Sequence, residues 1–146
     1  MARFLYAWEL GSNLGHLATF EPVAQQLRQD GHHVTFAVRE THACATFLDD
    51  RFAWLQAPRF DGSTGMAAPA SYADILAGVG YADPAALMGL VVAWRTLLQL
   101  ARPQLVFADH APTAILAART LGIPVMLFGP GFTMPPLRSP VPAMRP

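Results

Sequence analysis

Short apolar runs alternate with longer amphipathic stretches along most of this chain of 146 residues. Runs rich in β-branched and aromatic residues, bounded by Gly, Pro, Asp or His, are typical of buried β-strands. By this criterion the sequence predicts five strands, at Arg3–Trp8, Val34–Val38, Phe52–Gln56, Gln104–Asp109 and Pro124–Phe128.

The stretches between these runs carry apolar residues at helical spacing, together with helix start and stop signals. Asp83 and Thr41 are expected to cap helices at their N-termini. Gly31 and Gly122 follow helices as C-terminal glycines. Pro22 falls inside the first helix, so a kink or a delayed start is expected there. The expected helices are His16–Asp30, Thr41–Leu48, Ser71–Val79, Pro84–Arg102 and Pro112–Leu121.

Strands that alternate with helices predict a parallel sheet with helices on both faces. Right-handed crossovers then give a doubly wound, Rossmann-like α/β domain of about five strands, most simply in the order 3-2-1-4-5. In that order the first and fourth strands are neighbours at the switch point of the sheet. Ligands of such sheets bind there, beyond the carboxyl ends of the strands.

Two polar side chains stand where the first and fourth strands end. His16 follows a Gly-rich run after the first strand, and Asp109 closes the fourth strand. Both are expected at the same edge of the sheet, and a histidine oriented by a carboxylate is a general base for a hydroxyl. Two plainer alternatives stay open. His16 only forms local hydrogen bonds, or Asp109 caps the helix that begins at Pro112.

A Gly-rich turn joins the first strand to the first helix, and it consists of Gly11, Ser12, Asn13, Leu14 and Gly15. Such a turn at a helix N-terminus can hold an anion through its free backbone N–H groups. Its glycine spacing does not match the dinucleotide fingerprint, and the lysine of a phosphate-binding P-loop is missing. A nucleotide-cofactor site with Glu40 as the ribose-binding acid is therefore a less favoured alternative.

Composition narrows the classes of partner. Apolar residues make up 53% of the chain and charged residues only 14%. This fits equally a surface covered by a second domain or a partner and an uncovered surface that is simply poor in charge. Ten basic residues balance ten acidic ones, so neither nucleic acid nor an anionic membrane is expected as a partner. All ten basic residues are Arg, which is typical of a GC-rich bacterial genome.

The sequence also predicts a cellular compartment. The single cysteine, Cys44, excludes an internal disulfide and fits a reducing environment. The N-terminal apolar stretch is too short for a signal peptide, and the charge-free stretch between Asp83 and Arg95 is too short to span a membrane. We therefore expect a cytoplasmic protein without a membrane span.

Other kinds of site fit the sequence less well. The cluster of His32, His33, His42 and Cys44 matches no zinc-ligand spacing, so no metal is expected. The serines lack the nucleophile elbow of a hydrolase. The final segment, Gly129–Pro146, holds six prolines and predicts an extended stretch, either a linker or part of an incomplete domain.

Two blocks of the sequence resemble one protein family. The first runs from Gly15-His16-Leu17 to Gly31-His32-His33-Val34-Thr35-Phe36. The second is Pro103-Gln104-Leu105-Val106-Phe107-Ala108-Asp109 with the later Ala117–Pro124. Together they resemble the N-terminal domain of the GT-B glycosyltransferases that use nucleotide sugars, of the bacterial macrolide and plant flavonoid type. The chain departs from that pattern at Asp30, where the family has Arg.

The resemblance implies that residues 1–128 form a Rossmann-like, acceptor-binding domain, with 129–146 as a Pro-rich segment and the donor-binding domain absent. It assigns His16 as the base that deprotonates an acceptor hydroxyl and Asp109 as the partner that stabilises the imidazolium. The implied reaction is inverting transfer of a sugar from a nucleotide-diphospho-sugar to a small lipophilic acceptor, without a metal or cofactor. The chain alone is expected to be inactive.

Acceptor contacts are expected from the loops that follow the first, third and fifth strands. The residues expected to bind substrate are Gly11, Ser12, Asn13, Leu14, Gly15, Phe60, Tyr72, His110, Gly129 and Phe132. The expected partners are the lipophilic acceptor and a donor-binding domain or separate chain. The alternatives are one half of a split glycosyltransferase, or a non-catalytic module that binds the acceptor or docks a partner subunit.

Overall fold

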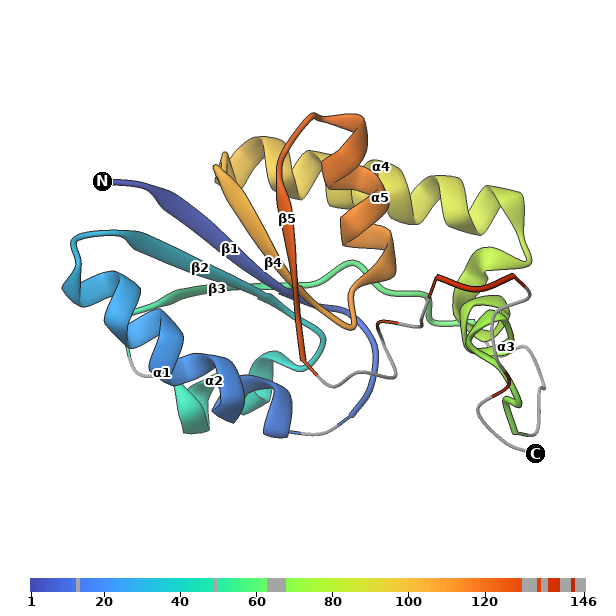
Figure 1. The fold of residues 1–146 in the computed structure, drawn as a ribbon, viewed down its shortest axis with the longest axis horizontal. Coiled ribbons are helices and arrows are strands. Elements are labelled where there is room, and N and C mark those ends of the chain that lie inside the picture. The colour runs from blue at the N-terminus through green and yellow to red at the C-terminus, as the bar shows by residue number, and fades with distance from the viewer. Residues whose placement is uncertain are drawn as a thin grey trace.

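A five-stranded parallel sheet forms the centre of the computed structural model, in the order β3-β2-β1-β4-β5 (Figure 1). The structure describes residues 1–12, 14–48, 50–62, 68–129, 134, 137–139 and 143. The strands are β1 (Arg3–Trp8), β2 (His33–Val38), β3 (Ala53–Gln56), β4 (Leu105–Asp109) and β5 (Val125–Phe128). The expected fold class and strand order are confirmed.

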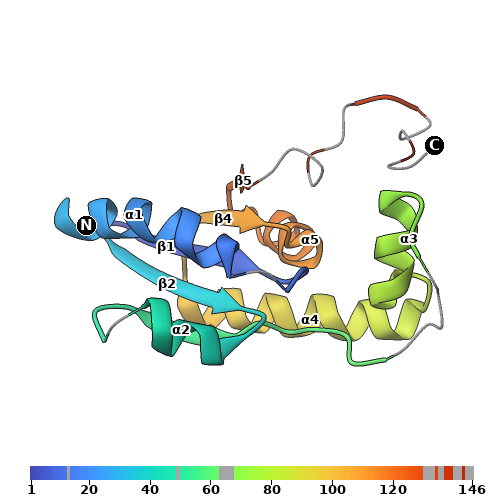
Figure 2. The same ribbon diagram turned by 90° about the horizontal axis from the view of Figure 1, so that it is seen from below.

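Helices cover both faces of the sheet. Helices α1 (Gly15–Gln29) and α2 (Thr41–Phe47) lie on one side, and α4 (Pro84–Ala101) and α5 (Pro112–Thr120) lie on the other (Figure 1). Between β3 and α4 the chain forms the short helix α3 (Tyr72–Leu76), followed by the π-helical turn η1 (Ala77–Tyr81). Helix α3 stands beyond the end of the sheet to which the strands point (Figure 2). It therefore borders the edge where the site is expected.

The alternation of side chains along the strands divides the core into two different halves. The half under α1 and α2 is aromatic, with Tyr6, Trp8, Phe20 and Phe36 fully buried. The half under α4 and α5 is built largely from alanines packed around Trp94. The aromatic half lies beneath His16, so large rigid side chains support that edge of the sheet.

Several helix ends differ from the sequence-based expectations. Thr41 does not cap α2, because the N-cap position is Glu40 and no side chain bonds there. Helix α1 begins at Gly15 and runs through Pro22, so the expected delayed start is wrong. Buried side chains on both sides of the proline, Phe20 and Ala24, pack α1 onto the sheet. Tertiary packing therefore outweighs the backbone bond that Pro22 cannot donate.

Helix α4 is long and apolar enough, by length and composition alone, to cross a membrane, with a mean hydropathy of 1.4 over 18 residues. The sequence analysis predicted this helix to Arg102 but considered only its charge-free part before Arg95 as a membrane span. In the structure its side chains Leu90, Trp94 and Leu98 are buried, the last two in the core under the sheet. The buried share of the 18-residue window is 17%, and a single such helix is weak evidence for a membrane span.

Candidate functional site

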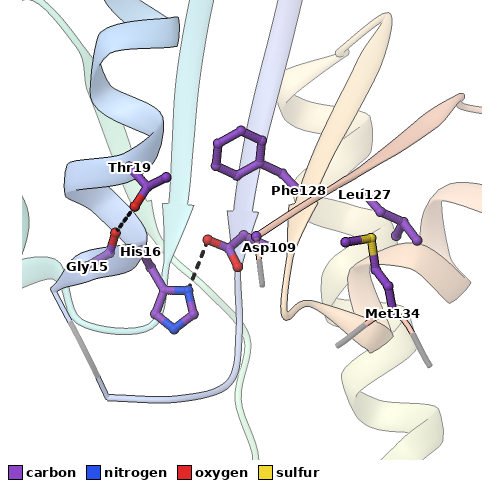
Figure 3. Close-up of a pocket in the computed structure, with 8 residues that line it drawn as sticks. Gly15, His16, Thr19, Asp109, Leu127, Phe128 and Met134 are labelled. Carbon is purple, nitrogen blue, oxygen red and sulfur yellow. Dashed lines mark hydrogen bonds and ion pairs between the residues drawn. The ribbon is translucent and has the colours of Figure 1, made fainter. Parts of the chain in front are cut away.

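The carboxyl ends of β1 and β4 bring His16 and Asp109 together. Trp8, the last residue of β1, pairs with Asp109 in the parallel register, and α1 begins one residue before His16. His16 Nδ1 lies 2.9 Å from Asp109 Oδ2, with the His16 side chain 12% exposed and the Asp109 side chain 1% exposed. The two side chains meet across the space between α1 and β4 (Figure 3). This juxtaposition is the one that the predicted topology requires.

Asp109 does not serve as the cap of α5, so that alternative is wrong. The N-cap residue of α5 is Ala111, and its side chain forms no capping hydrogen bond with the helix. The Asp109 carboxylate instead turns toward His16 and toward Tyr6, whose hydroxyl donates to Oδ2 over 2.7 Å. Burial and the Asp109 charge raise the pKa of Tyr6, so its hydroxyl stays protonated as a donor. No pattern in the sequence indicates this contact of Tyr6, since the position of its hydroxyl depends on packing.

Trp8 supports the other side of the histidine. The indole and imidazole rings stack with centroids 5.1 Å apart and an angle of 23° between their planes. Trp8 Nε1 donates to the carbonyl of Leu10 over 2.8 Å, which holds the indole in place. The imidazole of His16 is thus held by a hydrogen-bond partner at Nδ1 and by an aromatic face.

Gly11 borders the second nitrogen of this imidazole. A Cβ at Gly11 would lie 3.0 Å from His16 Nε2, and the φ of Gly11 is +89°, where side chains are disfavoured. Because Nδ1–H donates a hydrogen bond to Asp109, the neutral ring carries its free lone pair on Nε2. Glycine therefore leaves room for a ligand at the nitrogen that can act as a base.

A cavity of about 660 Å³ opens on the α1 and β5 side of the dyad. Its walls include the apolar side chains of Leu127, Phe128 and Met134 (Figure 3). Asp109 Oδ1 is buried and has no hydrogen-bond partner within the described part of the chain. A Cβ at Gly129, whose φ is +109°, would collide with this oxygen. The cavity therefore combines apolar walls with the polar side chain of His16, while Gly129 covers Asp109 Oδ1.

His110 lies next to the dyad in a left-handed backbone conformation, with a φ of 48°. A Cβ at Gly11 would lie 3.7 Å from His110 Nδ1, so both imidazoles border the same glycine. The ring of Tyr72 stacks on His110 with centroids 6.2 Å apart. Burial and the neighbouring His16 lower the pKa of His110 to about 4, so its ring is neutral near pH 7.

The remaining residues expected to bind substrate do not all lie at the cavity. Gly15 lines the cavity, and Leu14 is the exposed N-cap of α1. Ser12 is exposed in the turn between them and β1. Phe60 lies elsewhere, against Gly80 and in a separate groove along α4. Asn13 and Phe132 are outside the described residues.

Sequence analysis missed several side chains of this site. Thr19 lines the cavity one helical turn after His16. Its spacing of four residues from Gly15 places both on the same face of α1, and this pattern could have indicated Thr19 as a site residue. Glu9 is almost fully buried beside the site, and no pattern in the sequence pointed to it. Within the described ranges, no three His, Cys, Asp or Glu side chains gather into a possible metal site.

No protein-family model matches the chain, and no curated protein matches it. Solved structures do match. SsfS6, a glycosyltransferase of Streptomyces sp. SF2575, aligns with a TM-score of 0.60 and 20% identity over 91% of this chain and 42% of that one. MurG of Acinetobacter baumannii aligns with a TM-score of 0.59 and 20% identity over 87% of this chain and 33% of that one.

A plant protein gives the same result. A UGT transferase from Siraitia grosvenorii, solved with UDP, aligns with a TM-score of 0.56 and 18% identity over 87% of this chain and 28% of that one. The chain spans less than half the length of each of these proteins. At such identities the match shows the fold, which is that of one Rossmann-like half of a GT-B glycosyltransferase.

Proposed function

We propose that this chain is the acceptor-binding half of an inverting O-glycosyltransferase with His16 as its base. The observation that carries the proposal is the dyad, in which Asp109 holds His16 Nδ1 and leaves Nε2 beside Gly11. The fold shared with SsfS6 and MurG supports this class of enzyme. The residue roles rest on the geometry of this chain.

In the proposed reaction, the acceptor hydroxyl gives its proton to His16 Nε2 while its oxygen attacks the anomeric carbon of a nucleotide-diphospho-sugar. The bond from that carbon to the diphosphate oxygen breaks, and the nucleoside diphosphate leaves with the electron pair. Attack from the opposite face inverts the anomeric centre. Asp109 stabilises the imidazolium, and the Tyr6 hydroxyl holds the Asp109 carboxylate in place.

The cavity indicates the class of acceptor. Leu127, Phe128 and Met134 offer apolar contacts, and His16 offers an acceptor at Nε2 for one O–H group. A small lipophilic alcohol or phenol fits this combination. For the donor we propose a UDP- or TDP-sugar, since the Siraitia grosvenorii protein was solved with UDP and SsfS6 with thymidine diphosphate.

A second candidate is a module that binds the acceptor and docks a separate donor-binding chain. It is favoured by the apolar walls of the cavity, which fit acceptor binding without a catalytic step. In a split enzyme His16 still acts as the base. In a non-catalytic module, acceptor binding is the whole function and is unaffected by His16→Ala.

The test is sugar transfer by the chain combined with a donor-binding domain, using UDP- and TDP-sugars and phenolic acceptors. We expect no turnover from the chain alone. In the combined enzyme, His16→Ala is expected to lower kcat by about 10²–10⁴-fold, because it removes the general base. His42→Ala is the matched control, since His42 is 81% exposed and lies far along the chain from the dyad. Unchanged kcat in His16→Ala would reject His16 as the base.

A further inference from the structure

Glu9 is a deeply buried acid beside the dyad that the proposed reaction does not use. It follows β1 directly and is 1% exposed. The backbone N–H of Thr113 donates to Glu9 Oε2 over 2.9 Å, and the Thr113 hydroxyl donates to Oε1 over 2.5 Å. The backbone N–H of Ala114 provides a third bond. Glu9 thus caps the N-terminus of α5 from a segment 104 residues earlier.

The residues on either side of Glu9 contact the two histidines of the site. Trp8 stacks on His16. The N–H of Leu10 donates to the carbonyl of His110 over 3.0 Å. The Arg39 guanidinium donates to the carbonyl of Glu9 over 3.3 Å. The hydrogen bonds of Glu9 to α5 therefore connect the turn that leads to Gly11 and His16 with the rest of the fold.

A chain of hydrogen bonds continues from Glu9 to the segment between α3 and α4. The hydroxyls of Thr113 and Tyr81 lie 3.2 Å apart. Because Thr113 donates its hydroxyl proton to Glu9, the Tyr81 hydroxyl must donate to Thr113. Tyr72, on α3, stacks on His110. The carboxylate therefore links the β1–α1 turn, the start of α5 and the η1 turn.

We propose that Glu9 is a positioning residue for the dyad. In its ionised form, Glu9 holds the β1–α1 turn and η1 in place against the N-terminus of α5 through hydrogen bonds. The relevance to catalysis rests on the proposed function. The fastening itself is a property of this chain and is measurable without sugar transfer. Protonation of Glu9 reverses the direction of donation along these hydrogen bonds. The new carboxyl O–H donates to the Thr113 hydroxyl, and that hydroxyl then donates to Tyr81. Protonation also weakens the acceptor for the α5 N–H groups.

Burial of the Glu9 carboxyl places this change near neutral pH. Burial raises the pKa of Glu9 to about 7, although the bonds from α5 and the charge of Arg39 lower it. Tyr72 and Tyr81 also face this charge, and burial raises the pKa of both, that of Tyr81 to about 12. Both tyrosines therefore stay neutral near pH 7. Arg39 stays positive, so Glu9 is the member of this group that changes charge.

Carboxyl ¹³C NMR of the labelled chain tests the proposal. The chain has three glutamates, Glu9, Glu21 and Glu40, so the Glu9 signal is assigned as the one that persists in both Glu21→Gln and Glu40→Gln. We expect this signal to inflect near pH 7. The ring signals of Tyr81 are expected to follow the same inflection, because the Tyr81 hydroxyl is linked to the carboxylate through the Thr113 hydroxyl.

Glu21→Gln is the matched control, because Glu21 lies on α1 and bonds only to Gln25 among the contacts described for its side chain. Glu9→Gln should abolish the shared inflection, and Glu21→Gln should preserve it. A Glu9 signal that inflects below pH 5, or ring signals that do not follow it, would overturn the proposal. Both results are available from the wild-type chain, whether or not Glu9→Gln folds. If sugar transfer fails but the shared inflection is present, the proposed function is wrong and the role of Glu9 in fastening the turn stands.

Discussion

Two glycines stand directly against the polar atoms of the dyad, Gly11 at His16 Nε2 and Gly129 at Asp109 Oδ1. Each has a positive φ, which costs other residues about 1–2 kcal/mol, and each leaves space that a Cβ would fill. Their positions in turns beside the predicted strands suggested that both bind substrate. Which atoms they face was not predictable, because the path of a turn depends on contacts with distant residues.

Gly11 adopts a positive φ and leaves space at His16 Nε2, and Gly11→Ala tests these two roles separately when compared with a control glycine. Gly31 is the matched control, since its φ of +81° is similar to the +89° of Gly11 and nothing lies within 4 Å of its Cβ position. We expect both variants to lower the free energy of unfolding by about 1 kcal/mol. Only Gly11→Ala should lower kcat/KM of the combined enzyme, by about tenfold or more, because it crowds His16 Nε2. Equal kcat/KM in the two variants would show that Nε2 needs no open space.

Helix ends were predictable where the signal lies within a few residues. Asp83 caps α4, as expected, by accepting from the N–H groups of Ala85 and Ala86. Thr41 does not cap α2, although it is the kind of residue that often does. The cap of α5 comes from Glu9 across 104 residues, and no local pattern indicates such a contact. Nearby residues in the sequence therefore predicted the helices and strands better than the long-range hydrogen bonds between them.

The contrast between two helix starts gives a stability prediction. Asp83→Ala is expected to lower the free energy of unfolding by about 1 kcal/mol, because two N–H groups of α4 lose their acceptor. Thr41→Ala should change it by less than about 0.5 kcal/mol, because the Thr41 hydroxyl caps nothing. Urea unfolding of the two variants measures the difference. A larger loss in Thr41→Ala would contradict the assignment of the caps.

For the whole molecule, the alternation of strands and helices was sufficient to predict the sheet order and to bring His16 beside Asp109. The support around that pair was not predictable. The Tyr6 hydroxyl reaches Asp109 because β1 and β4 pair in one particular register, with Tyr6 opposite Phe107. Register and packing are properties of the folded chain, so a buried tyrosine in a strand gives no sign of its polar contact.

The most direct test of the account is the kcat of Asp109→Asn, measured alone and together with His16→Ala in the enzyme combined with a donor-binding domain. If Asp109 acts by holding His16, Asp109→Asn alone should lower kcat by up to about 10²–10⁴-fold. In the His16→Ala background the same change should lower kcat by less than about threefold, because residues that act as a unit are not additive. Full, independent losses from the two substitutions would contradict a dyad.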